Sequence, residues 1–249
     1  MLELTEENSK RYLAHRLGVD AGAIMARELT GGVSNFVLRV GIPGRAPFIL
    51  KQSLGQLRTK ELWLCDRSRI FQEKAALQLL ATFAPPGSLP RILFTDEENF
   101  LFAMSAADED APTWKEELLA GRVDLRLFLQ AAEIQTAFWE AGDGGGGFGD
   151  LELFDQLRLD PYYRFTAGRH PDLRRYFDGA IAQARGQRVA LTHGDWSPKN
   201  FLINAGARLF SIDYEVMHYG DPSFDCAFLL NHFLLKGRES LAKHGLWFW

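Results

Sequence analysis

Hydrophobic residues in the N-terminal part of the chain occur in short runs, separated by glycine, proline and other turn-forming residues. Such runs are typical of β-strands joined by tight turns. An amphipathic helical pattern precedes them and ends at Gly18, and strands are predicted at 24–29, 36–40, 48–51, 91–94 and 100–104. The segment 30–35, between the first two strands, contains two adjacent glycines. We therefore expect an antiparallel sheet whose first hairpin has a glycine-rich tip.

Between the third and fourth predicted strands, apolar residues recur at the spacing of a helix over 66–83. On a helical wheel, Glu73 falls between Leu77 and Leu80, within the apolar face. An unpaired carboxylate is costly to bury, so this placement predicts a cationic partner for Glu73. The alternative is an ordinary residue near the polar edge of an amphipathic helix.

The pattern changes after an acidic, turn-rich segment at 105–112, which we take as the boundary between two lobes, 1–104 and 105–249. Helical patterns dominate the second lobe, at 114–120, at 125–140 after a capping Asp124, at 151–158 and at 171–185. A short strand at 189–191 and a hairpin formed by 201–203 and 209–212 follow. A last helix is predicted from Asp221-Pro222 to Lys236, with Gly237 as its stop.

Composition narrows the class of protein. The chain has 249 residues, of which 47% are apolar, and its net charge is −4. This length and apolar content are enough to form a globular core, and together with the low net charge they argue against a disordered chain. No Lys/Arg block offers the charge that nucleic acid binding requires. The longest apolar stretch, 226–235, is about half of the roughly 20 residues needed to span a bilayer. The N-terminus lacks the pattern of a secretory signal, so we expect a cytoplasmic protein without membrane or nucleic acid partners.

Three polar residues of the second lobe are predicted to converge. Asn200 directly precedes the first strand of the hairpin and Asp213 follows its second strand, so both lie at the same end of the sheet. Asp195, in the loop that leaves the preceding strand, can reach this end as well. Two carboxylates and an amide oxygen, without a His/Cys cluster, suit a hard cation such as Mg²⁺ better than zinc.

The segment His193-Gly194-Asp195-Trp196-Ser197-Pro198-Lys199-Asn200, with Ile212-Asp213 after it, resembles the catalytic segment of the aminoglycoside phosphotransferase and choline kinase family. The resemblance covers most of the chain. It implies an α+β, bilobal, protein-kinase-like fold, with an antiparallel sheet in the N-terminal lobe and a mainly helical C-terminal lobe. It also implies an enzyme that uses ATP and Mg²⁺ to phosphorylate a hydroxyl of a small molecule.

By the same resemblance, Asp195 is the catalytic carboxylate, and Asn200 and Asp213 hold Mg²⁺ against the ATP phosphates. Lys51 contacts the phosphates and pairs with Glu73. His193 is expected to brace the catalytic loop. The remaining nucleotide-binding residues implied are those of the glycine-rich tip and one in the segment 102–105 that faces adenine: Gly31, Gly32, Ser34, Asn35 and Met104.

Each of these residues has an ordinary structural interpretation when taken alone: Lys51 as a strand lysine, Asp195 as a turn former, Asn200 as a cap and Asp213 as the start of a turn. Their joint order along the chain favours the kinase interpretation. Asp221 and Asp225 are interpreted as structural, since a helix N-terminus accounts for Asp221.

The acceptor is expected to be small. Only seven residues separate Asp213 from Asp221, which leaves no room for the activation loop and peptide platform of a protein kinase. No GxxxxGK[ST] motif is present, which excludes a P-loop ATPase. Aminoglycosides, amino alcohols and sugars are the candidate acceptors.

Two alternatives remain open: a nucleotide-binding pseudokinase, and a shortened, inactive family member that acts as a binding module. The chain is short for this family after its last catalytic motif. The aromatic terminus Trp247-Phe248-Trp249 is predicted to pack into the second lobe or against a partner subunit in a homo-oligomer, unless the chain is a shortened version of a longer enzyme.

Overall fold

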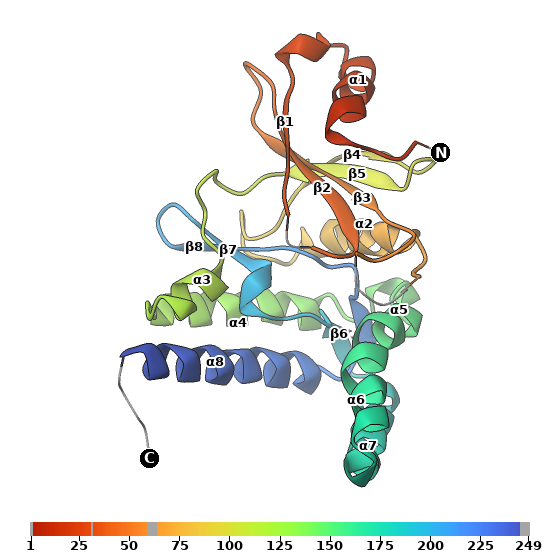
Figure 1. The fold of residues 1–249 in the computed structure, drawn as a ribbon, viewed down its shortest axis with the longest axis vertical. Coiled ribbons are helices and arrows are strands. Elements are labelled where there is room, and N and C mark those ends of the chain that lie inside the picture. Colours follow the sequence, from red (N-terminus) through yellow and green to blue (C-terminus); the bar gives the residue numbers. More distant parts are fainter. Residues whose placement is uncertain (1, 31, 59–63, 245–249) are drawn as a thin grey trace. The chain divides into compact units, whose positions relative to one another are not determined.

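The computed structural model describes residues 2–30, 32–58 and 64–244 (Figure 1). The chain forms two compact units. We call Met1–Lys74 with Pro90–Ala106 the sheet unit, and Ala75–Leu89 with Ala107–Trp249 the helical unit. Gly31 and the aromatic terminus 247–249 lie outside the described residues.

The sheet unit is built on five antiparallel strands in the order β1-β2-β3-β5-β4 (Figure 1). The strands predicted from the sequence are all present, with ends shifted by at most two residues. They are β1 (Met25–Glu28), β2 (Asn35–Gly41), β3 (Phe48–Ser53), β4 (Ile92–Asp96) and β5 (Leu101–Ser105).

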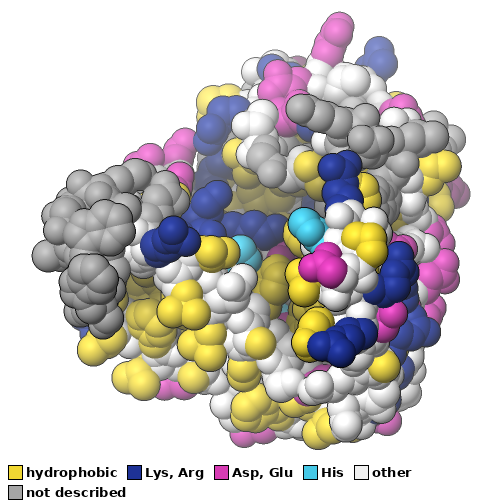
Figure 2. Space-filling view, turned by 60° about the horizontal axis from the view of Figure 1, so that its bottom comes forward, with side chains coloured by type: hydrophobic (Ala, Val, Ile, Leu, Met, Phe, Trp, Pro, Cys, Tyr) yellow, Lys and Arg dark blue, Asp and Glu magenta, His cyan; other side chains and the backbone are white. Residues whose placement is uncertain are grey.

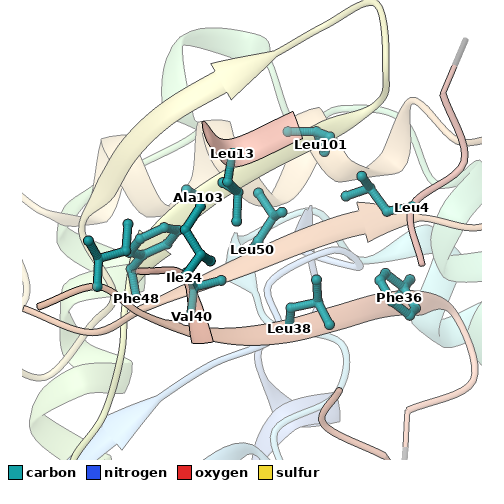
Figure 3. Packing of buried hydrophobic residues seen from close by; sticks show 11 residues of the cluster. Leu4, Leu13, Ile24, Phe36, Leu38, Val40, Phe48, Leu50, Leu101 and Ala103 are labelled. Carbon is teal, nitrogen blue, oxygen red and sulfur yellow. The ribbon is translucent and has the colours of Figure 1, made fainter. Parts of the chain in front are cut away.

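Helix α1 (Glu6–Leu17) covers the core of this unit. Its start is stabilised by a capping box between Thr5 and Asn8, and its end by Gly18 at φ 64°, in the left-handed region that glycine adopts without strain. Leu13 of α1 packs with Leu38 and Leu50 of the sheet, and all three are fully buried (Figure 3). The sheet therefore has a dry apolar face that holds β2 and β3 in register.

Helix α2 (Arg69–Leu80) begins three residues later than the apolar pattern predicted. Its first turns, which carry Glu73, belong to the sheet unit, and its last turns belong to the helical unit. Ile70, Leu77 and Leu80 are buried as expected.

The helical unit contains one long helix that was predicted with its correct ends, α4 (Leu125–Glu140), capped by the Asp124 side chain. The other helical elements are α3 (Trp114–Leu119), η2 (Gly144–Gly146), α5 (Glu152–Phe154), the π-helix η3 (Asp155–Arg164), α6 (Phe165–Arg169), η4 (Pro171–Leu173), α7 (Arg174–Gly186), η5 (Pro198–Asn200) and α8 (Ser223–His244).

Two short sheets carry the polar loops of this unit. The predicted hairpin is present as β7 (Phe201–Asn204) and β8 (Arg208–Ser211). Strand β6 (Ala190–Thr192) pairs with β9 (His218–Gly220), a strand that the sequence did not reveal because it has only three residues. The pairing fixes the end of the segment 213–221 that lies next to Asp221.

Two helix predictions were wrong. Gly237 does not stop the last helix, since α8 continues to His244; an internal glycine costs only about 1 kcal/mol, which the rest of a long helix can offset. The helix expected over 151–158 is instead part of a longer run that widens into the π-helix η3 and accommodates Pro161. Across the residues that the structure describes, no helix combines the length and apolarity needed to cross a bilayer.

Candidate active site

Lys51 and Glu73 form a buried ion pair in the sheet unit. Lys51 Nζ lies 2.6 Å from Glu73 Oε2, with side chains only 6% and 0% exposed. The lysine comes from β3, the most buried strand of the sheet, and the glutamate from the second turn of α2. The cationic partner predicted for Glu73 is therefore present. A pair buried to this extent fixes the lysine ammonium in one position.

Arg69 anchors the end of the glycine-rich tip. Its guanidinium is buried and donates hydrogen bonds to the carbonyl of Ser34 and, at 2.8 Å, to that of Leu54. Asn35 Nδ2 donates to Ser34 Oγ at 2.9 Å, and a Cβ on Gly32 would meet no atom within 4 Å. The tip is thus open around Gly32 and firmly held at Ser34. No pattern in the sequence predicted this role of Arg69.

Met104 lies near the end of β5, between two strands. It pairs with Ile49 of β3 on one side and Ile92 of β4 on the other, and its side chain is buried. The next residue, Ser105, continues the pairing through its backbone N–H to the carbonyl of Arg91 at 2.9 Å. The segment that is expected to face adenine is therefore the end of β5, which is paired with a strand on each side.

In the helical unit, Asp225 of α8 holds the segment 193–200, which is the expected catalytic loop. Its carboxylate accepts hydrogen bonds from the backbone N–H of His193 at 2.6 Å and of Gly194 at 2.9 Å. Asp225 is buried, and burial raises its pKa to about 7 against the opposing effect of these two bonds. Asp225 therefore has a structural role, as expected: it fixes the backbone directly before Asp195.

His193 braces the loop from inside. Its Nδ1 accepts from the Asp195 backbone N–H at 3.2 Å, so its Nε2 is the nitrogen that donates to the Ile212 carbonyl at 3.3 Å. Burial lowers the pKa of His193 to about 4, although the nearby carboxylates oppose this. The ring is therefore neutral at pH 7 and ties the catalytic loop to the end of β8, as a bracing role requires.

Asp195, Asn200 and Asp213 lie together, as the hairpin argument predicted. Asn200 Nδ2 donates to the Asp195 carbonyl at 2.8 Å, and the Ile212 backbone N–H donates to the Asn200 carbonyl at 2.9 Å. Asp213 follows at φ 71°, a conformation that non-glycine residues rarely adopt and that often marks a functional position.

The donors around Asp213 fit a divalent cation. One carboxylate oxygen of Asp213 and one of Glu215 lie within 4.8 Å of each other, and Glu215 is buried. Carboxylate oxygens are the hard ligands that Mg²⁺ prefers, and Asn200, whose backbone carbonyl accepts from the Ile212 N–H, offers an amide oxygen in the same unit. Sequence reasoning did not include Glu215, although its place two residues after Asp213 was visible.

Two cations flank the Asp195 carboxylate, and the sequence predicted neither. Arg158 Nη2 lies 2.8 Å from Asp195 Oδ2, and Lys199 Nζ lies 2.9 Å from the same oxygen. The Arg158 side chain is 10% exposed and that of Lys199 is 51% exposed. Arg158 also donates to the Gly194 carbonyl at 2.7 Å, so it holds both the side chain of Asp195 and the backbone directly before it. Lys199 stands on the solvent side of the carboxylate.

We expect Gly194→Ala to destabilise the protein by about 2 kcal/mol. Gly194 has φ 76°, and a Cβ there would lie 2.9 Å from Val216 Cγ1 and 3.0 Å from the Val216 carbonyl oxygen. Gly142→Ala is the matched control, because Gly142 has a similar φ of 66° but no atom within 4 Å of an added Cβ. Urea denaturation measures both; equal losses of stability would contradict the steric argument.

The buried His218 makes folding stability depend on pH. It stacks on Phe154 with ring centroids 4.2 Å apart, and burial lowers its pKa to about 4. The folded state therefore binds fewer protons than the unfolded state between about pH 6.5 and pH 4, so this residue's contribution is complete above pH 6.5 and is lost as the pH falls. We expect His218→Gln to cost less stability, relative to wild type, at pH 4.5 than at pH 7. Denaturant titrations at both pH values test this, and a cost independent of pH would contradict it.

Comparison with known proteins places this arrangement in a family. Residues 26–246 match the model of APH, described as the phosphotransferase enzyme family. The search among curated proteins gave no match.

Solved structures share the fold. A choline/ethanolamine kinase family protein from Mesorhizobium loti has a TM-score of 0.59 and 22% identity, covering 96% of this chain and 76% of that chain. The choline kinase LicA from Streptococcus pneumoniae has a TM-score of 0.55 and 17% identity, covering 95% and 79%. The streptomycin-ATP complex of APH(2")-IIa has a TM-score of 0.53 and 14% identity, covering 99% and 84%. At these identities the similarity establishes the protein-kinase-like fold, as expected from the sequence.

Proposed function

Starting from the fact that the chain belongs to the phosphotransferase enzyme family, we propose that it transfers the γ-phosphate of ATP to a hydroxyl of a small molecule, with Mg²⁺. The observation that carries the proposal is the convergence of Asp195, Asn200 and Asp213 in the helical unit. An ATP-dependent enzyme of this kind is expected in the cytoplasm.

Asp195 is proposed as the catalytic carboxylate. Its backbone is fixed by Asn200 on one side and, through Gly194, by Asp225 on the other. A carboxylate held in this way can orient the acceptor hydroxyl and take its proton as the new O–P bond forms. Positioning and charge neutralisation supply most of the rate in such reactions.

The sheet unit is proposed to bind the nucleotide. The Lys51 ammonium, fixed by Glu73, would contact the phosphates, and the tip residues Gly31, Gly32, Ser34 and Asn35 would cover them with backbone N–H groups. Met104 would lie beside adenine. ATP is present in the similar APH(2")-IIa complex, which supports this assignment by analogy.

Asn200 and Asp213 are proposed as the Mg²⁺ ligands, and Glu215 is placed to support them. When bound, Mg²⁺ neutralises charge on the phosphates of the nucleotide. Asp213 has a left-handed backbone conformation directly after β8, and a ligand role would explain why a strained residue lies at this position.

A small acceptor is favoured over a protein. The segment from Tyr214 to Asp221, where a protein kinase has its activation loop, consists of a turn and the buried strand β9. In its second half, His218–Gly220, the segment is paired with β6, so that edge is unavailable for docking a peptide.

Two measurements on the wild-type protein test the proposal. Thermal unfolding with ATP and Mg²⁺ should show stabilisation, and mass spectrometry should detect a phosphorylated product in a panel of aminoglycosides, amino alcohols, sugars and anionic hydroxyl compounds. Nucleotide stabilisation without any product would favour the pseudokinase or the inactive binding module. Absence of nucleotide stabilisation would overturn the proposal altogether.

A further inference from the structure

Three elements of the helical unit pack against one another: α3, α8 and η5, the short helix that follows Asp195. Trp114 of α3 joins them, with its ring centroid 5.5 Å from that of Phe201 and 4.8 Å from that of Phe233. Lys115 follows Trp114 in the sequence, and Lys199 of η5 precedes Phe201 by two residues. The aromatic cluster thus brings two exposed lysines to the same side of the catalytic loop.

His232 of α8 interacts with the positive charges of these three elements. Lys236 Nζ lies 3.0 Å from His232 Nδ1, and because an ammonium can only donate, the imidazole accepts and is neutral. Burial lowers the pKa of His232, and the charges of Lys236, Lys199 and Lys115 lower it further against the opposing effect of Asp195. The lysines of all three elements therefore act on one ring, on which the charge of Asp195 acts as well.

The acidic side chains near these lysines already have bonding partners. Asp195 is already paired with the buried Arg158, which balances its charge before Lys199 is counted. On α3, Glu116 accepts from the Thr113 backbone N–H at 2.7 Å as part of the helix cap, and Glu117 pairs with Arg122 at 2.6 Å. Asp213, which also faces Lys199, belongs to the proposed metal site. Arg158 and Lys199 thus place two positive charges against the single carboxylate of Asp195, and Lys115 adds a third on the neighbouring helix α3.

We propose that the acceptor of this enzyme carries an anionic group, a carboxylate or a phosphate ester, which Lys199 and Lys115 bind while Asp195 holds the reacting hydroxyl. This inference rests on the proposed function and gives its substrate class. The acceptor oxygen forms a bond to the γ-phosphorus, the bond from that phosphorus to the β-phosphate oxygen breaks, the hydroxyl proton goes to Asp195, and ADP leaves.

The charge arrangement disfavours cationic acceptors. An amino alcohol or an aminoglycoside would bring an ammonium against Lys199 and Lys115, and like charges repel most strongly where solvent is partly excluded. Figure 2 shows Lys and Arg side chains near His side chains on one face of the molecule, with acidic side chains among them. Acceptor choice in this chain is therefore expected to differ from that of streptomycin or choline, the ligand and substrate named for two similar structures.

The test uses wild-type protein, radiolabelled ATP and a bacterial metabolite extract that has been separated by ion exchange into anionic, neutral and cationic fractions. Labelled product is expected from the anionic fraction, at a rate at least tenfold above the other two. Prior phosphatase treatment of that fraction, followed by removal of the phosphatase, distinguishes the two anions: lost product identifies a phosphate ester, and retained product a carboxylate.

Variants locate the anion site. Lys199→Gln and Lys115→Glu should each raise the KM for the anionic fraction at least tenfold while ATP still stabilises the protein. Lys10→Glu, an exposed lysine of α1, makes the same charge change as Lys115→Glu and should leave KM within twofold. A KM that is unchanged in both variants at the proposed site would overturn the assignment of these lysines.

Three results keep this inference separate from the proposed function. Product formed mainly from the cationic or neutral fraction would overturn the anionic acceptor but leave the phosphotransferase standing. ATP stabilisation with no product from any fraction would overturn both. Product from the anionic fraction that depends on Lys199 and Lys115 would support both.

Discussion

Asp195→Asn is expected to reduce phosphoryl transfer by about a thousandfold, the typical loss when a positioned acid–base group is removed. The substitution keeps the size of the side chain and leaves the backbone contacts with Asn200 and His193 in place. What it removes is the negative charge that orients the acceptor hydroxyl and takes its proton. Steady-state transfer rates measure the effect.

The same variant should still bind nucleotide, since Lys51 and Glu73, the residues proposed to position the ATP phosphates, lie in the sheet unit. Thermal unfolding with ATP and Mg²⁺ checks this. Asp172→Asn, at an exposed position of η4, is the matched control and should transfer phosphate at the wild-type rate. Undiminished turnover by Asp195→Asn would remove Asp195 from the catalytic role.

Asp225→Ala should lower the free energy of unfolding by about 4 kcal/mol, because it leaves two buried backbone N–H groups without an acceptor, at about 1–3 kcal/mol each. These are the N–H groups of His193 and Gly194, bonded to the carboxylate at 2.6 and 2.9 Å. Guanidinium denaturation measures the loss. The variant should also lose transfer activity, since the loop before Asp195 is no longer held.

Asp221→Ala provides the comparison for this effect. Asp221 caps the start of α8 by accepting from the Ser223 backbone N–H at 2.9 Å, and removal of such a cap costs about 1 kcal/mol. A loss for Asp225→Ala no larger than that for Asp221→Ala would show that the catalytic loop does not depend on this carboxylate.

Local rules of sequence predicted much of the fold. The capping box at Thr5, the glycine at position 18 and the cap at Asp124 each set a helix end through neighbouring residues alone. The β7–β8 hairpin is equally local, and antiparallel pairing then brings Asn200 and Asp213 together without any long-range information.

The missed features depend on contacts between distant segments. Arg158 reaches Asp195 only because the π-helix η3 presents it to the catalytic loop, and nothing in the local sequence indicates that pairing. Strand β9 is too short to have a periodic pattern and forms because β6 lies beside it. Lys199, four residues after Asp195, was visible, but its ion pair required the turn geometry of η5.

The buried segment that carries β9 has a consequence for control of the enzyme. From Tyr214 to His218 every residue is buried, and β9 is paired with β6 along its length. A modifying enzyme therefore has no exposed hydroxyl to phosphorylate within 214–218. We expect this part of the protein to be constitutively competent, so that supply of the acceptor and the amount of protein, rather than a covalent switch in this segment, set the flux.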